Sequence, residues 1–349
     1  MMNNKFDVAV VGAASLAGEA VLALLAERKF PLAKLFAVDR VAQTASHVEY
    51  KDEPLVIHEL ADFDFEQVQL AIFLTDTLLA AEYVPRAAEA GCIAIDTSPC
   101  FRYEADVPLV IPGINDHLIA DYRVRMIVAN PSSATSQLIK SIKPIYDAVG
   151  IDSLNVTVLL SVSQMGKPGQ EELGKQTARL LNFQDAEKEV FSQQIAFNVI
   201  PECGVALSEG YTTDELDLIK GAQKVLSNDK ISIMATAVIV PVFFAHGEVI
   251  SMKTSVPVGA DKVIELLDNV PGLQLTKGTS NTGPSPVADA SGKESIAIGR
   301  IRAGLGEDGQ DLCFWSVADN IRSGIALNSV QTAEILVKDY LQAIVTKNL

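Results

Sequence analysis

Residues 6–18 read FDVAVVGAASLAG, and this segment predicts how the first part of the chain folds. The compact apolar run FDVAVV is typical of a buried strand, and a turn of small residues leads from it into helical spacing over residues 16–28. Glu19 breaks the apolar run after about ten residues, which argues against a secretory signal peptide. The stretch therefore predicts a strand, a turn and a helix.

Similar short apolar strands recur along the first 132 residues. They alternate with helical stretches, and this order predicts a parallel, doubly wound α/β sheet. We expect strands at 35–39, 70–75, 92–98 and 125–131, and a helix at 80–91. The helix that follows Pro131 is expected to close this unit.

The pattern changes near residue 151, where longer strands with partial alternation begin. We expect a strand at 153–164, a helix at 171–182, and two antiparallel strands around a turn within 231–255. Residues 295–319 predict a second antiparallel pair, 278–292 a loop, and roughly 320–346 a helix that returns to the first domain. The prediction is a first domain of residues 1–132 and about 320–349, and an α+β domain of residues 133–319 with a largely antiparallel sheet.

Composition excludes several classes of protein. The chain has 44 acidic and 28 basic residues and a formal net charge of -16, which argues against nucleic-acid and membrane partners. The cysteines are widely spaced and the histidines show no ligand spacing, so we expect no metal site and no disulfide framework. The cysteines are Cys92, Cys100, Cys203 and Cys313. This pattern suits a reducing cytoplasm.

The glycine-containing turn after the first strand is a candidate dinucleotide site. Such a turn presents backbone N–H groups and a helix N-terminus to a pyrophosphate. Asp39 ends the second strand, where it either accepts from a ribose hydroxyl, as in NAD sites, or is a solvated loop aspartate. The candidate turn consists of Gly12, Ala13, Ala14, Ser15, Leu16, Ala17 and Gly18.

Two further segments could carry chemistry, although each has an ordinary structural interpretation. Residues 130–137 (NPSSATSQ) join a strand to a helix, where a nucleophile would be stabilised by the helix dipole. Serine and threonine are also common helix N-caps. From the residues alone, the capping interpretation is favoured over a nucleophile. His246 closes an apolar strand, where a lone histidine is more often structural than catalytic.

Three motifs together are similar to those of the aspartate-semialdehyde dehydrogenases, nearly from end to end. GAASLAG (12–18) stands where that family has GATGxVG. Phe101-Arg102 and DVPLVIPGIN (106–115) resemble FRxxxDVPLVVPEVN, and DNIRSGIALNSVQ (319–331) resembles DNLRKGAALNAVQ. The resemblance implies a Rossmann-type domain, an α+β dimerisation domain and a homodimer.

The resemblance also implies roles for individual residues. In the family a cysteine attacks the aldehyde, a histidine is the acid/base, and NADP removes hydride before phosphate releases the acyl group. Ser133 stands at the nucleophile position and His246 at the acid/base position. The resemblance implies that Arg102 and Asn130 bind phosphate or substrate. Thr75 and Asn320 are implied as further contacts of the cofactor.

Several residues depart from the family pattern. Serine replaces the nucleophilic cysteine at position 133, and Ile239 replaces the arginine that grips the substrate carboxylate. Leu160 replaces a glutamine, and Asp217 replaces a lysine. Ser15 replaces the middle glycine of the turn, and a positive φ there would cost about 1–2 kcal/mol and weaken dinucleotide binding.

These departures resemble those of the Usg proteins, which are homologues without the cysteine. The first interpretation is a catalytically degenerate protein that binds NAD or NADP weakly and acts through a protein partner or in regulation. The alternative is an active NAD(P)-dependent oxidoreductase that uses Ser133 and His246 on an aldehyde or acyl substrate. Asp39 favours NAD, whereas the neighbouring Arg40 could meet a 2′-phosphate, so the choice of cofactor stays open.

Overall fold

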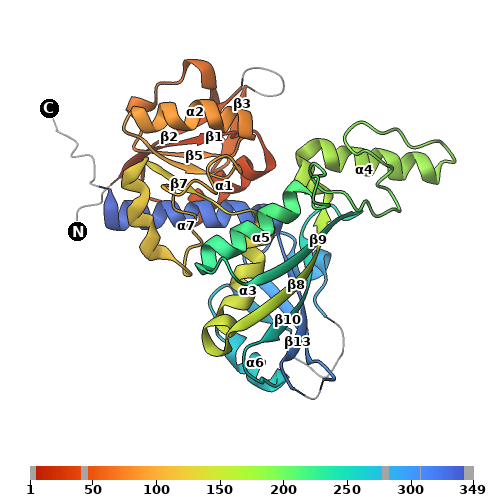
Figure 1. The fold of residues 1–349 in the computed structure, drawn as a ribbon. Coiled ribbons are helices and arrows are strands. Elements are labelled where there is room, and N and C mark those ends of the chain that lie inside the picture. Colours follow the sequence, from red (N-terminus) through yellow and green to blue (C-terminus); the bar gives the residue numbers. More distant parts are fainter. Residues whose placement is uncertain (1–4, 41–45, 277–282, 307, 342–349) are drawn as a thin grey trace. The chain divides into compact units, whose positions relative to one another are not determined.

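The computed structural model describes residues 5–40, 46–276, 283–306 and 308–341. The chain divides into two compact units (Figure 1). Unit 1 contains the residues up to Ser132 together with those from Ile325 onward, and unit 2 contains Ser133–Gly324.

Unit 1 is built on a seven-stranded sheet in the order β3-β4-β2-β1-β5-β6-β7. Every neighbouring pair is parallel except β3 with β4, so the predicted parallel α/β sheet is confirmed. The chain order reverses between β1 and β5, which is the switch point where such sheets bind ligands. The strands are β1 (Phe6–Val11), β2 (Leu32–Asp39), β3 (His47–Tyr50), β4 (Glu53–Glu59), β5 (Leu70–Phe73), β6 (Ile93–Asp96) and β7 (Ile127–Ala129).

Helices lie on both sides of this sheet. Figure 1 shows its strands between α2 (Thr77–Glu89) and α7 (Leu327–Ile335). Val8 and Val10 of β1 share a buried cluster with residues of α1 (Leu16–Glu27) and α7. Alternate residues of a strand point to opposite faces, so Ala9 and Val11 face the other side. The shorter turns are η1 (Leu60–Asp62), η2 (Phe65–Gln67) and η3 (Asp116–Val124).

Two sequence expectations for this part of the chain were wrong. Residues 47–59, for which the sequence predicted no strand, form the antiparallel pair β3 and β4. The helix after Pro131, α3 (Ser133–Val149), belongs to unit 2, where it contacts α5, α6 and the sheet. The C-terminal helical run begins at Asn320, as predicted, and comprises η6 (Asn320–Ala326), α7 and η7 (Leu336–Tyr340). Residues 342–346 of the predicted helix lie outside the described residues.

Unit 2 contains a mixed six-stranded sheet, largely antiparallel as predicted, in the order β11-β12-β13-β10-β8-β9. The pair expected within 231–255 is not a hairpin, because β8 lies between β9 and β10 and pairs with both. The predicted second pair, β12 with β13, is present. The strands are β8 (Ile151–Ser161), β9 (Ser232–Val240), β10 (His246–Thr254), β11 (Leu273–Leu275), β12 (Ile296–Ala303) and β13 (Asp311–Ala318).

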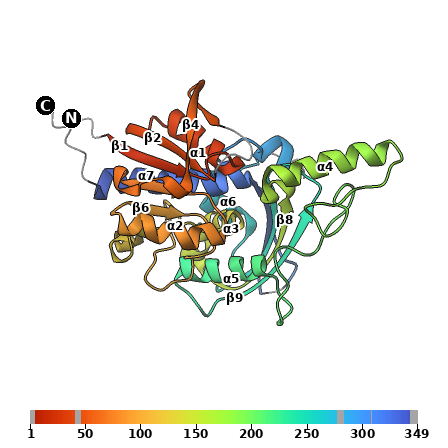
Figure 2. The same cartoon turned by 90° about the horizontal axis from the view of Figure 1, so that it is seen from above.

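Three helices of unit 2 contact this sheet: α3, α5 (Thr213–Leu226) and α6 (Ala260–Leu267). Along β9 the buried residues alternate with exposed or partly exposed ones, as expected for a sheet with one covered face. Figures 1 and 2 show α4 (Gly166–Leu181) extending outward from the rest of unit 2. It follows η4 (Val162–Met165), and η5 (Pro286–Ala290) lies before β12. Within the described ranges, no helix is long and apolar enough to cross a membrane.

Candidate functional site

The turn between β1 and α1 requires its two glycines. Gly12 has φ +84°, and a Cβ there would lie 2.5 Å from the carbonyl oxygen of Leu74. A Cβ on Gly18 would lie 2.4 Å from the carbonyl oxygen of Gly12. Side chains at either position would therefore force the turn open, and the glycines let α1 start close against the sheet.

Ser15 does not carry the strain that its substitution for glycine led us to expect. Its φ is -76° and its ψ 163°, which is extended backbone, and it is the N-cap of α1. The hydroxyl accepts from the N–H of Gly18 at 3.0 Å and donates to the carbonyl of Gly12 at 2.7 Å. The expected backbone handicap is absent, because the positive φ of this turn falls on Gly12 instead.

Two further residues implied as cofactor contacts, Asp39 and Thr75, lie at the carboxyl ends of β2 and β5, the two strands that flank β1. Asp39 accepts from the N–H groups of Ala14, at 3.0 Å, and Arg40, at 2.8 Å. Thr75 follows β5, and its buried hydroxyl has no hydrogen-bond partner among the described residues. An orphaned hydroxyl at the switch point, beside a glycine turn, suits a dinucleotide.

Arg102 and Asn130 are buried together in unit 1. The guanidinium of Arg102 donates to the backbone carbonyl of Asn130 at 2.8 Å. The Asn130 amide donates to the hydroxyl of Ser329 at 3.0 Å and the carbonyl of Ile325 at 3.3 Å. These bonds tie the end of β7 to the last helical run, so Asn130 has a structural role, and its contact with substrate stays a prediction.

Asp96 is the buried carboxylate of this region. Burial raises its pKa to about 6, although hydrogen bonds from Ser98 and the charge of Arg102 oppose the shift. The Asp96 carboxylate accepts from the Ser98 N–H at 3.0 Å and hydroxyl at 2.8 Å. Sequence reasoning had not singled out Asp96.

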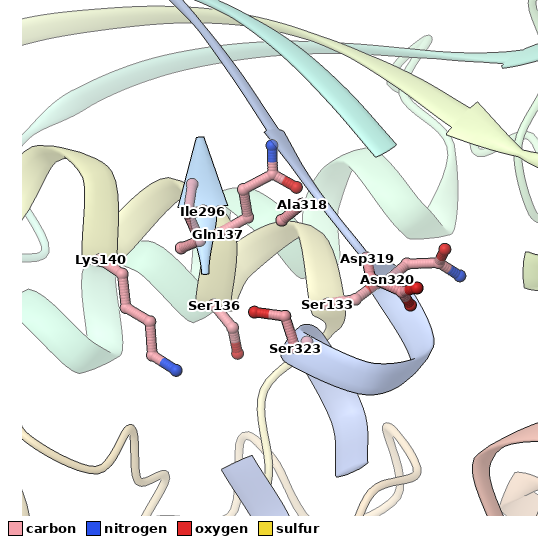
Figure 3. Close-up of a pocket in the computed structure, with 10 residues that line it drawn as sticks. Ser133, Ser136, Gln137, Lys140, Ile296, Ala318, Asp319, Asn320 and Ser323 are labelled. Carbon is pink, nitrogen blue, oxygen red and sulfur yellow. The ribbon is translucent and has the colours of Figure 1, made fainter. Parts of the chain in front are cut away.

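Ser133 is the first residue of α3 and lines a narrow pocket in unit 2. Figure 3 shows this pocket between the start of α3 and the turn that follows β13. A Cβ on Gly324 would lie 2.5 Å from the Cβ of Ser133, so glycine allows η6 to pack against the start of α3. The pocket is lined by Ser133, Ser136, Gln137, Lys140, Ile296, Ala318, Asp319, Asn320, Ser323 and Gly324.

His246 is the first residue of β10 and is 1% exposed. Neither ring nitrogen has a hydrogen-bond partner among the described residues, and burial lowers its pKa to about 3. The ring is therefore neutral at pH 7. No hydrogen bond joins His246 to Ser133 within this part of the chain, so the two implied catalytic positions form no dyad here.

Asn320 organises the backbone around His246. Its side-chain oxygen accepts from the N–H of Ala245 at 3.1 Å and from the hydroxyls of Ser161 at 3.2 Å and Ser163 at 3.0 Å. Ala245 has φ 73°, an uncommon conformation for alanine. Asn320 thus holds the end of β8 and the start of β10, and its implied contact with the cofactor stays a prediction.

A buried polar chain that sequence reasoning missed lies behind the pocket. The Gln137 amide donates to the hydroxyl of Ser316 at 3.0 Å, and that hydroxyl donates to Glu248 at 3.4 Å. Burial raises the pKa of Glu248 well above its usual value. Glu248 shares the buried side of β10 with His246, two residues away, a spacing that the sequence pattern alone could have flagged.

Two of the departures from the family pattern lie side by side. Leu160 of β8 and Ile239 of β9 are register partners, 4% and 7% exposed. Ile239 also exchanges backbone hydrogen bonds with Ile200, at 2.8 and 3.0 Å. An apolar contact therefore occupies the positions at which the resemblance implies a glutamine and an arginine.

Comparison with known proteins matches both parts of the chain to family models. Residues 7–122 match the semialdehyde dehydrogenase NAD binding domain, and residues 142–323 match the semialdehyde dehydrogenase dimerisation domain. Aspartate-semialdehyde dehydrogenase 2 of Vibrio cholerae is 41% identical over 339 residues, which is 97% of this chain and 100% of that protein. The chain belongs to the aspartate-semialdehyde dehydrogenase family.

Solved structures of this family have the same fold. Aspartate semialdehyde dehydrogenase II from Vibrio cholerae, solved in complex with ASA, has a TM-score of 0.93 at 41% identity, over 97% of this chain and 99% of that one. A probable aspartate-semialdehyde dehydrogenase from Pseudomonas aeruginosa has a TM-score of 0.91 at 32% identity, covering 97% of this chain and 100% of its own. The similarity to this family therefore extends over both units.

Proposed function

We propose that this chain is a family member, of the Usg type, that does not catalyse the thiol-dependent oxidation of aspartate semialdehyde. The observation that carries the proposal is the residue at the start of α3, where the resemblance places the nucleophile. That residue is Ser133, and none of the four cysteines lines its pocket. The proposed remaining functions are dinucleotide binding, dimerisation and interaction with a protein partner.

A serine at this position lacks the means to replace a thiolate. Its hydroxyl needs a base in contact to become a nucleophile. His246 makes no hydrogen bond to Ser133, and its pKa of about 3 makes it a poor proton acceptor. Loss of a nucleophile costs on the order of 10⁶ in rate in a studied hydrolase, so any residual turnover is small.

The substrate positions support the same proposal. The side chains of Leu160 and Ile239 offer a carboxylate no hydrogen-bond donor, and both are buried. A buried charge that lacks its partner costs about 3–5 kcal/mol. A substrate with a carboxylate at this place would therefore bind much more weakly than in a family member with the arginine.

The first unit is proposed to keep weak binding of NAD or NADP, whose nicotinamide would supply hydride transfer when bound. Gly12 and Gly18 let α1 start close against the sheet, and the first N–H groups of α1, which have no partner within the helix, would be available to a pyrophosphate. Binding is expected to be weak because Asp39 and Ser15 already accept from two N–H groups of the turn.

We also propose that the chain is a homodimer joined through unit 2. The matched dimerisation domain supports this, as does the open face of the sheet. That face includes the exposed residues Met234, Asn155 and Val249 from three strands. Sedimentation at micromolar concentration should give twice the mass of the chain, and a monomer would contradict the proposal.

The second candidate function is an active NAD(P)-dependent oxidoreductase on an aldehyde or acyl substrate. It is favoured by the extent of similarity to proteins named aspartate-semialdehyde dehydrogenase, and by the presence of His246 and Arg102 at their implied positions. This function would require at least a conformational change that brings the Ser133 hydroxyl and the His246 ring into contact.

Steady-state turnover separates the two candidates. Purified protein with aspartate semialdehyde, phosphate and NAD or NADP should form no reduced cofactor above background. A turnover number within about a thousandfold of the usual range of 1–10³ s⁻¹ would support the second candidate instead.

A further inference from the structure

The side chain of Glu59, the last residue of β4, is an unexplained polar group of unit 1. Its Oε2 atom is buried and has no hydrogen-bond partner among the described residues. Glu59 is also the N-cap of η1, but its carboxylate makes no capping hydrogen bond there. A buried acceptor without a donor is uncommon and calls for an explanation. A ligand that brings its own donor would supply one.

Glu59 lies beside Asp39 at the carboxyl end of the sheet. The two residues are register partners on β4 and β2, which run parallel. Ala37 and Ile57, two residues earlier on these strands, pack in the cluster that contains residues of α1. Because alternate residues of a strand share a face, Asp39 and Glu59 both lie on the α1 side of the sheet. The strands that carry them are about 4.8 Å apart.

The order of the strands matches the order of groups in the adenosine half of a dinucleotide. The turn after β1 is the candidate site for the pyrophosphate, and Asp39 at the end of β2 suits a ribose hydroxyl. The phosphate is joined to C5′ of the ribose and the base to C1′, so the base lies on the side of the ribose away from the phosphate. The next strand outward from β1 and β2 is β4, which ends at Glu59 (Figure 2).

Adenine is the base that suits an unpartnered carboxylate. Its 6-amino group is a hydrogen-bond donor, and it is the only N–H donor of the base because N9 is bonded to the ribose. A carboxylate only accepts hydrogen bonds, so the two groups are complementary. A base with an oxygen at position 6 would instead place an acceptor against an acceptor.

We propose that Glu59 accepts a hydrogen bond from the 6-amino group of adenine and thereby selects adenine dinucleotides. The inference rests on the proposed function, because it requires that unit 1 binds NAD or NADP. The match of residues 7–122 to an NAD binding domain supports that class of ligand. The glycine turn and Asp39 account for the pyrophosphate and the ribose, and Glu59 adds the residue that distinguishes one base from another.

Binding of NADH and of its hypoxanthine analogue tests the proposal on the intact protein. In the analogue an oxygen replaces the 6-amino group, and the dinucleotide outside the base is unchanged. The fluorescence of the reduced nicotinamide reports the binding of both, so no turnover is needed. We expect the unmodified protein to bind NADH at least about tenfold more tightly, which is the factor that a hydrogen bond to a charged group contributes.

Two glutamine variants separate the role of Glu59 from a general effect of charge. A glutamine amide accepts through its oxygen and donates through its nitrogen, so Glu59→Gln should bind the two dinucleotides within about threefold of each other. Glu53→Gln is the matched control, because Glu53 is the exposed first residue of the same strand. This control should keep the full preference for NADH.

Equal affinity of the unmodified protein for the two dinucleotides would overturn the role of Glu59 and leave the proposed function intact. A preference for NADH that Glu59→Gln retains in full would also overturn it, because another residue would then distinguish the base. Absence of binding by either dinucleotide would overturn both the proposed dinucleotide binding and this role. Turnover of aspartate semialdehyde together with a preference that Glu59→Gln removes would overturn only the proposed lack of catalysis.

Discussion

The carboxylate of Asp39 accepts a hydrogen bond from the backbone N–H of Ala14, at 3.0 Å. This bond joins the end of β2 to the turn that would meet a pyrophosphate. Arg40, the neighbouring cation, pairs instead with Asp76 at 3.4 Å. The negative charge therefore lies closer to the turn, which favours a cofactor without a 2′-phosphate.

We accordingly expect NAD to bind more tightly than NADP, and Asp39→Ser to raise the affinity for NADP at least tenfold. A carboxylate about 4 Å from a phosphate charge costs about 1–4 kcal/mol, depending on exposure. Fluorescence titration at low and high salt measures both cofactors, with Asp64→Ser as a control far along the chain. Tighter binding of NADP than NAD by the unmodified protein would refute this interpretation.

A second prediction concerns acid stability and His246. Its pKa is about 3 in the folded chain and lies near 6.5 when the chain unfolds. Between these values only the unfolded state takes up the proton, so stability falls as pH falls through this window. Relative to His246→Gln, the unmodified protein should lose roughly 2 kcal/mol between pH 7 and pH 5.

Urea unfolding at several pH values measures this difference. His47 is exposed, so His47→Gln serves as the control and should keep the acid sensitivity of the unmodified protein. Equal pH dependence of His246→Gln and the unmodified protein would mean that His246 is solvated or paired in solution.

A third prediction compares two glycines of unit 2. Gly324→Ala should destabilise the protein by about 1–3 kcal/mol, because the new methyl group meets Ser133 at the start of α3. Gly174 lies in α4 with no atom within 4 Å of an added Cβ. Gly174→Ala should therefore stabilise by up to about 1 kcal/mol, through helix propensity alone. Thermal unfolding of both variants checks the pair, and equal effects would contradict the packing of η6 on Ser133.

Much of the fold could be predicted from the sequence because local pattern determines it. Compact apolar runs such as 6–11 and 70–75 mark strands that are covered on both faces. The order of the strands in unit 2 depends instead on long-range pairing. β9 and β10 are close in sequence, but β8 inserts between them, and no local pattern specifies that choice.

The candidate site was predictable only in part. The motifs predicted the positions of Ser133, His246 and the glycine turn. They did not predict the structural hydrogen bonds that the side chains of Asn130 and Asn320 make. The prediction of backbone strain at Ser15 was wrong, because the φ angle of one residue depends on the conformation of the whole turn. The Ser136 hydroxyl is buried and has no hydrogen-bond partner among the described residues. Helical periodicity predicts that Ser136 is buried, but it does not predict which atoms lack partners.

We propose that Ser133 does not form an acyl-enzyme with aspartate semialdehyde. The most direct measurement is a rapid-mixing experiment with protein, aspartate semialdehyde and NAD or NADP, without phosphate. Without phosphate only the first half-reaction can proceed, so an active nucleophile reveals itself as one burst of reduced cofactor. We expect no burst with either cofactor, and a burst approaching one reduced cofactor per subunit would show that Ser133 is an active nucleophile.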